Sequence, residues 1–167
     1  MWYNVVSRKP GAVHWTKETR FTAANGVVTD NLTGLIWLMN SNCAGTTTAP
    51  AGLGTWVTAF AWVAELNSGG TMNSQPCGDT SGASNSRQTD WRLPNVREMQ
   101  SLIDYGNFSP ALPTGHPFTN VQSSYYWTSS TNVYYPASAW DVNLSYGIVN
   151  DNVKSSYNCV WPVRGGQ

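Results

Sequence analysis

The chain has 167 residues, with nine Lys or Arg against nine Asp or Glu, no net charge and a pI near 6.7. That length indicates one domain that can bury a core without help from a metal or disulfide, and the absence of a basic stripe argues against a nucleic-acid interface. No apolar run approaches the roughly 18 to 20 residues that span a bilayer, and the N-terminus lacks the apolar stretch of a signal peptide.

Short strands are expected at the start of the domain, which we place at residues 20–167 behind an N-terminal extension of residues 1–19. Asn25-Gly26 lies between two runs with strand-forming residues, which is the signal of a two-residue hairpin. The apolar run Leu35–Met39 that follows is short enough for a buried strand. The opening of the domain is therefore predicted to be β-structure.

Two helices are predicted next, over residues 55–67 and 95–105. Gly69-Gly70 ends the first helix, while Asn95 and Glu98 have the spacing of a capping box at the start of the second. The apolar stripe of the first helix, which we expect to be buried, consists of Trp56, Phe60, Val63 and Ala64.

The three cysteines carry a structural prediction. Cys43 and Cys77 lie in Gly/Ser/Thr-rich loops on either side of the first helix, a placement that suits a disulfide clamping that helix. An intracellular chain would keep both as thiols, and Cys159 is left as the odd, unpaired cysteine. With His14 and His116 as the only histidines and no Cys-x-x-Cys, we expect no zinc site and no cofactor.

The rest of the chain is predicted to be irregular and then β. Residues 107–120 carry three prolines and cannot form regular structure. Apolar and aromatic runs after Tyr125 predict an antiparallel meander that ends near Val163. Strands, two helices and a meander in that order indicate an α+β fold with two helices packed on antiparallel sheets.

The most distinctive segment is residues 132–159, which we call the tail. Fifteen of its 28 residues are Asn, Ser, Tyr or Asp, and Lys154 is its only basic residue. Tyr supplies contact area at low entropy cost, and Ser and Asn supply adaptable hydrogen bonds, so this composition is typical of a recognition surface. Polar β-hairpins with solvated turns would have a similar composition.

If the tail is a binding surface, its apolar and polar side chains should point in opposite directions. Trp140, Val142, Leu144 and Val149 should point inward and hold the surface still. The candidate ligand-binding residues, which apart from Ser138 should lie mostly exposed on one contiguous face, are Tyr134, Tyr135, Ser138, Asp141, Asn143, Ser145, Tyr146, Ile148, Asn150, Asp151, Asn152, Ser155, Ser156, Tyr157 and Asn158.

Long ordered motifs give the chain a family resemblance from about Arg20 to Gln167. It resembles the Lcl C-terminal domain family, named for the terminal domain of a bacterial collagen-like adhesin, which implies a C-type-lectin-like fold that binds carbohydrates or proteins. Cys43 and Cys77 match positions where family members often have Cys, and Cys159 does not. The motifs that carry the resemblance are Arg20–Thr22, Val28–Trp37, Asp90–Tyr105, Tyr126–Ser130, Ala139-Trp140 and Val163–Gly166.

The tail also resembles the variable region of proteins diversified by retroelements, several of which use this scaffold. Mutation of the adenines in Asn codons shifts a segment towards Asn, Ser, Asp, Tyr, Ile, Val and Cys and can never produce Lys, Glu or Trp. In the tail only Trp140 and Lys154 are of types that this mutation never produces. The resemblance implies a receptor-binding display protein outside the cell, on a cell surface or on a virion. Its expected partner is a protein or glycan on a host or partner cell.

Other functions remain open at this stage. An invariant carbohydrate- or glycosaminoglycan-binding adhesin domain is one, and an oxidase of the formylglycine-generating type, which shares the broader fold, is another. Such an oxidase needs a reactive Cys pair, and only Cys159 is left over, so we expect no enzyme. Asn150, Asp151 and Asn152 with Asp141 offer oxygens for calcium, but a solvated turn explains them better.

Overall fold

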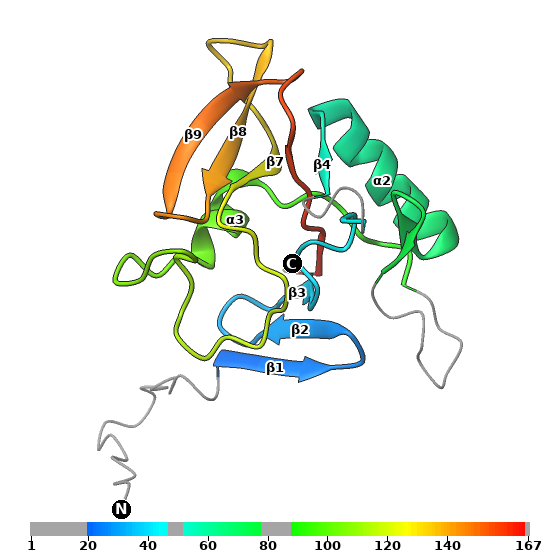
Figure 1. Ribbon diagram of the computed structural model, residues 1–167, viewed down its shortest axis with the longest axis vertical. Coiled ribbons are helices and arrows are strands. Elements are labelled where there is room, and N and C mark those ends of the chain that lie inside the picture. Colours follow the sequence, from blue (N-terminus) through cyan, green and yellow to red (C-terminus); the bar gives the residue numbers. More distant parts are fainter. Residues whose placement is uncertain (1–19, 47–51, 78–87, 166–167) are drawn as a thin grey trace, which may run out of the picture.

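The computed structural model describes residues 20–46, 52–77 and 88–165. They form two helices, a four-stranded sheet, a five-stranded sheet and a small hairpin (Figure 1). The strands are β1 (Phe21–Ala24), β2 (Val27–Asp30), β3 (Leu35–Leu38), β4 (Leu53–Gly54), β5 (Thr71–Met72), β6 (Gln75–Pro76), β7 (Tyr125–Thr131), β8 (Ser138–Asn143), β9 (Ile148–Val153), β10 (Asn158–Cys159) and β11 (Val163–Gly165), and the helices are α2 (Trp56–Gly69) and α3 (Val96–Ser101). The α+β class is confirmed.

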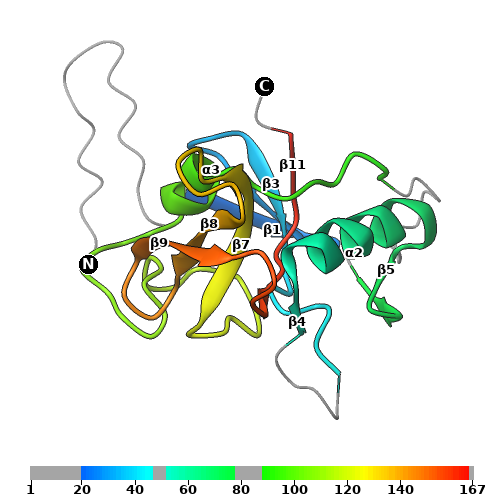
Figure 2. The same ribbon diagram turned by 90° about the horizontal axis from the view of Figure 1, so that it is seen from above.

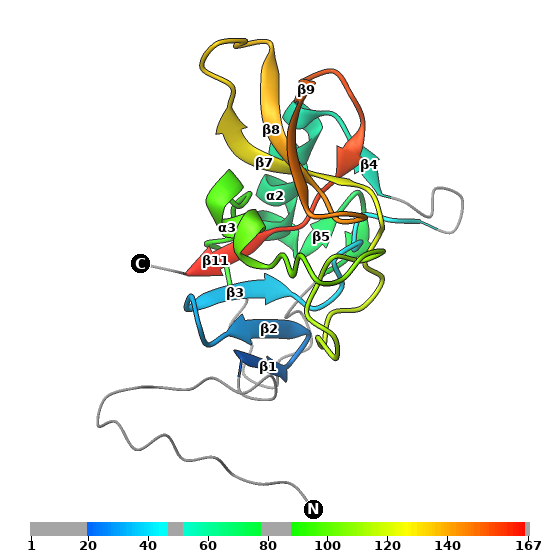
Figure 3. The ribbon, with the colours of Figure 1, turned by 90° about the vertical axis from the view of Figure 1, so that its left-hand side faces the viewer.

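The first sheet has the order β1-β2-β3-β11 and is antiparallel throughout. Asn25 and Gly26 both have positive φ, 51° and 77°, in the turn between β1 and β2. Such backbone angles match the twist of a tight hairpin, which confirms the hairpin prediction. Since β11 pairs with β3, the end of the described chain lies beside its first strands (Figure 3).

Helix α2 has the predicted start but a different buried face. Thr55 accepts a hydrogen bond from the Thr58 amide at 3.2 Å, and Gly70, at φ 74°, ends the helix. The buried residues of α2 are Ala59, Val63 and Leu66. Phe60 is 40% exposed and Ala64 is exposed, so the prediction that both are buried is wrong.

Helix α3 begins with the predicted capping box and ends early. Asn95 accepts from the Glu98 amide at 2.9 Å, and Glu98 accepts from the Asn95 amide at 2.7 Å. The helix stops at Ser101 rather than near residue 105, because the Asp104 amide donates to the Ala111 carbonyl outside the helix.

The five-stranded sheet has the order β4-β10-β7-β8-β9. Strands β7, β8 and β9 form the predicted antiparallel meander, but β10 pairs with β7 in parallel. The sheet therefore has one parallel pair beside the predicted antiparallel meander. A short hairpin of β5 and β6 follows α2.

Long-range contacts hold the two sheets together. Trp161 donates from its indole nitrogen to the Leu38 carbonyl at 2.8 Å and packs on Trp37, Phe118 and Tyr126. The C-terminal segment that carries Trp161 passes between α3 and α2 in two perpendicular views (Figures 1 and 2). The core therefore includes residues from both ends of the domain.

The cysteines are arranged as one disulfide and one thiol. Cys43 and Cys77 form the disulfide, with 5.7 Å between their Cα atoms and 34 residues of sequence separation. Cys159 is free and buried. Both predictions are confirmed, whereas the N-terminal extension of residues 1–19, including His14, lies outside the described residues.

Candidate functional site

Strand pairing divides the middle of the tail into two faces. Residues directly opposite each other in antiparallel strands share a face, and Asp141 pairs with Asn150 while Asn143 pairs with Ile148. One face, which we call the Asn face, therefore carries the side chains of Tyr125, Asp141, Asn143, Ile148, Asn150 and Asn152. The opposite face carries Tyr126, Trp140, Val142, Val149, Asp151 and Val153.

The four tail residues that were predicted to point inward are buried or half-buried. Val142 and Leu144 are fully buried, and Trp140 and Val149 are half-buried. Asp151 points to the same side as Trp140, because strand residues alternate between faces. The prediction that Asp151 shares one face with Asn150 and Asn152 is therefore wrong.

Four candidate residues are buried rather than exposed. Ser138, Asp141, Asn143 and Asn158 all have little or no accessible surface. The predicted exposure of the last three is wrong, because hydrogen bonds draw their side chains into the sheet. Asn143, for example, accepts from the Ser145 amide at 2.7 Å and shapes the turn that follows β8.

Asp141 is the centre of a buried polar cluster. Its Oδ2 accepts hydrogen bonds from Asn152 Nδ2 at 2.5 Å and Asn158 Nδ2 at 2.8 Å. Its Oδ1 is buried without a hydrogen bond to any described residue. Burial raises the pKa of Asp141 and the nearby charge of Asp151 adds to the rise, although the two Asn amides oppose it. The cluster ties β8, β9 and β10 together.

Replacing Asp141 with Asn should make stability less dependent on pH. The folded-state pKa of Asp141 is raised. The contribution of Asp141 to the free energy of unfolding is therefore fully present below the ordinary carboxyl pKa, and it is lost as pH rises through the folded-state pKa. The unfolding free energy of the variant relative to wild type should therefore increase from about pH 4 towards pH 7. Urea denaturation across that range measures it, and parallel pH profiles would contradict the assignment.

A tight turn before β8 presents two tyrosines. Buried Asn132 accepts hydrogen bonds from the amides of Tyr134 at 3.0 Å and Tyr135 at 3.4 Å, and the Ser138 amide donates to the Tyr135 carbonyl. Tyr134 is 85% and Tyr135 68% exposed. Both tyrosines therefore belong to a hydrogen-bonded turn, and the loop between β7 and β8 lies at one end of the sheet (Figure 1).

The segment 154–157, which we call the crossing segment, lies at the same end of the molecule as that turn (Figures 1 and 3). The Lys154 amide donates to the Ala137 carbonyl, and the Lys154 carbonyl accepts from the Trp56 amide. Ser155 and Tyr157 are exposed and Ser156 is half-buried. The crossing segment thus joins the exposed tyrosines to the start of α2.

Tyr146 lies at the other end of the Asn face. It is exposed in the turn between β8 and β9, where the Gly147 amide donates to the Asn143 carbonyl. Gly147 has φ 73°, and a Cβ there would meet Ile103 Cγ2 at 2.5 Å. The six residues of β8 span about 20 Å, so Tyr134 and Tyr146 flank the Asn face from opposite ends. Half-buried Ser145 also belongs to this turn.

Sequence reasoning missed exposed residues beside the candidates. Tyr125 is 37% exposed and belongs to the Asn face, and Val133 and Val153 are also exposed. The alternation of Tyr125 with buried Tyr126 could have identified the first. No comparable signal marks the valines, because their exposure depends on the turn and on the edge position of β9.

The described residues do not bring potential metal ligands together. Within residues 20–46, 52–77 and 88–165, no three His, Cys, Asp or Glu side chains form a group that could hold a metal. Burial lowers the pKa of His116, which lies in the Pro-rich segment. In the same described ranges, no helix is both long and apolar enough to cross a membrane.

A protein-family model matches most of the chain. The family model described as the Lcl C-terminal domain matches residues 26–164, which include both helices, the tail and every strand except β1 and the last residue of β11. No curated protein matches the chain.

Proposed function

The chain belongs to the Lcl C-terminal domain family, and we propose that it is a binding domain whose ligand contacts the exposed residues of the tail. One observation carries the proposal. Seven of the 14 exposed large apolar or aromatic side chains of the described residues lie in the tail: Val133, Tyr134, Tyr135, Tyr146, Ile148, Val153 and Tyr157. Such a concentration of exposed apolar and aromatic side chains supports the proposal of an interaction surface.

The tail is held in shape before any ligand arrives. Asn132 fixes the turn that carries Tyr134 and Tyr135, and the Asp141 cluster joins three strands within the Asn face. Exposed aromatic rings on an ordered backbone lose little conformational freedom on binding. This arrangement supports a recognition surface over simple solvated hairpins.

The charge of the surface limits the classes of ligand that it favours. Lys154 is the only basic residue of the tail, and its ammonium lies 4.2 Å above the Trp56 ring. A sulfated glycosaminoglycan is recognised through clusters of Lys and Arg. The surface therefore favours a protein or a weakly charged glycan on a host or partner cell over a polyanionic glycan.

An oxidase function is unsupported by the cysteine chemistry. Cys43 and Cys77 are paired, and burial raises the pKa of Cys159 to about 12. The thiolate is the reactive form of cysteine, so Cys159 is held in an unreactive state. A disulfide is also typical of proteins outside the cytosol, which supports a place outside the cell or on a cell or virion surface.

We also infer that the tail is diversified by a retroelement. The gene should then lie near a reverse transcriptase gene and a near-copy of the segment encoding Tyr126–Arg164. Sequencing the gene across natural isolates tests this expectation. Substitutions should concentrate at adenine-rich codons of the tail and spare Trp140, Val142 and Leu144. Substitutions spread evenly over buried and exposed codons would contradict it.

A further inference from the structure

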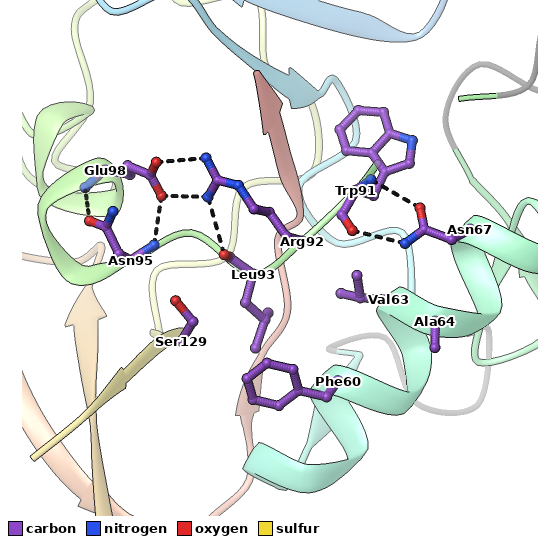
Figure 4. Close-up of a pocket in the computed structure, with 10 residues that line it drawn as sticks. All are labelled: Phe60, Val63, Ala64, Asn67, Trp91, Arg92, Leu93, Asn95, Glu98 and Ser129. Atoms are coloured by element: carbon purple, nitrogen blue, oxygen red, sulfur yellow. Dashed lines mark hydrogen bonds and ion pairs between the residues drawn. The ribbon is translucent and has the colours of Figure 1, made fainter. Parts of the chain in front are cut away.

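The groove between α2 and the segment that leads into α3 has a volume of about 560 Å³, and its polar side chains are paired within the protein (Figure 4). Asn67 accepts from the Trp91 amide at 3.0 Å and donates to the Trp91 carbonyl at 2.9 Å. Glu98 accepts two hydrogen bonds from Arg92, both at 2.7 Å. Backbone groups without a partner lie instead on the outer edge of β9.

Strand β9 is the outermost strand of the five-stranded sheet (Figure 1). The Lys154 amide donates to the Ala137 carbonyl, and the register between β8 and β9 is regular, so hydrogen-bonded pairs fall at the even-numbered residues of β9. The N–H and C=O groups of Val149 and Asp151 therefore point away from β8. No described residue bonds to these outward groups.

The outer edge of β9 has none of the usual features that block strand pairing. Sheet edges are commonly protected by Lys, Pro or a β-bulge, whereas the sequence Ile-Val-Asn-Asp-Asn-Val has no Lys or Pro and pairs with β8 without a register shift. The outward groups of Val149 and Asp151 are two residues apart, which is about 7 Å in a strand. An extended polypeptide repeats its own donors and acceptors at that spacing, so the edge is complementary to an added strand.

Asp151 gives the added strand a preferred charge. Its side chain is half-buried and forms no ion pair with any residue of the described ranges. Because the backbone of Asp151 points outward, an antiparallel strand would place one residue directly opposite it, with its side chain on the same face. Opposite charges at such positions stabilise a strand pair, so Lys or Arg is favoured there.

A second copy of β9 does not provide that positive charge. If two copies paired through their outward groups, the β9 residue opposite Asp151 would be Val149, Asp151 or Val153 of the other copy. None of these residues is basic, and two Asp151 side chains opposite each other would repel. The charge of the edge therefore favours a segment of a different protein over a second copy.

We propose that the outer edge of β9 binds an extended segment of a partner protein as an added antiparallel strand, with a Lys or Arg side chain beside Asp151. This proposal rests on the proposed function, because Ile148 and Val153 at the ends of β9 belong to the proposed binding surface. It names a protein rather than a glycan as the partner.

The test titrates acetyl-Val-Thr-Lys-Thr-Val-amide into the full ¹⁵N-labelled chain and follows amide hydrogen exchange. The peptide should slow exchange at Val149 and Asp151, whose amides gain acceptors, and leave Asn150 unchanged, because its amide already faces β8. Replacing the peptide Lys with Gln should weaken binding about two- to fivefold, and replacing it with Glu should weaken binding further. Equal binding of the three peptides, or no protection of Val149 and Asp151, would overturn the proposal.

Matched changes in the peptide and in the protein locate the contact. Methylation of the peptide Lys amide nitrogen removes the donor to the Asp151 carbonyl, whereas methylation of the next Thr amide alters a group that faces solvent. Only the first should abolish protection. Asp151→Asn should remove the preference for Lys over Gln, while Asp90→Asn removes a carboxylate paired with Arg164 and should keep it. Equal effects within either pair would contradict strand addition.

Hydrogen exchange without peptide tests the other possible occupants of the edge. Protection of Val149 and Asp151 at every protein concentration would show that another segment of the chain covers them, and protection that rises with concentration would show a second copy. Either result would overturn a partner segment as the occupant. Tyr134→Ala and Tyr135→Ala together should leave peptide binding unchanged, so failure of the tyrosines as a ligand surface and failure of the strand site give different results.

Discussion

Replacing Cys43 and Cys77 together with Ala is expected to lower the free energy of unfolding by about 4 kcal/mol at 25 °C in the chain-entropy description of cross-links. The bond closes a segment with a sequence separation of 34 residues, and removing it gives the unfolded chain the freedom that the cross-link denies. Both cysteines are buried, at 5% and 2% exposure, so the loss includes some packing.

Chemical denaturation with and without a reductant measures the effect. The reduced wild type should unfold at a lower denaturant concentration than the oxidised protein. Adding reductant to the double variant should cause no further loss, because Cys159 has no disulfide to break. A double variant as stable as the oxidised wild type would show that the bond does not stabilise the fold.

Replacing Tyr134, Tyr135, Asn150 and Tyr157 together with Ala is expected to abolish measurable binding while leaving the fold intact. Each tyrosine that acts as a hot spot should contribute 1 to 2 kcal/mol or more, which is about tenfold in affinity or greater. All four residues are exposed, so each substitution should change stability by no more than about 0.5 kcal/mol.

The binding measurement uses surface plasmon resonance against the glycan or cell-surface protein that the wild type selects from an array. Leu32→Ala is the matched control, because Leu32 is an exposed apolar residue in the turn between β2 and β3, outside the tail. It should bind like wild type. Full affinity in the quadruple variant would remove the tail as the ligand surface.

Local features of the fold could be predicted from the sequence because neighbouring residues determine them. Asn25-Gly26 makes a tight hairpin since both residues tolerate positive φ. Asn95 and Glu98 begin α3 because each satisfies the other's backbone amide. The family resemblance is likewise confirmed by the match over residues 26–164.

The candidate surface could be predicted only in part. The sequence identified the exposed tyrosines because a turn rich in polar residues and Pro places them outside the sheet. It could not separate Asn150 from Asp151, since their opposite directions depend on the register between β8 and β9. Composition describes which residues are available, whereas pairing decides which of them share a face.

The sequence by itself determined the fold class, the caps and turns, and the presence of a polar tail, because these follow from local backbone preferences and from apolar periodicity. Only the tertiary structure decided the burial of Asp141, whose partners Asn152 and Asn158 come from two other strands. It also decided that Phe60 is 40% exposed although this residue lies on the predicted apolar stripe of α2. Contacts between distant segments set both outcomes, and no local pattern contains them.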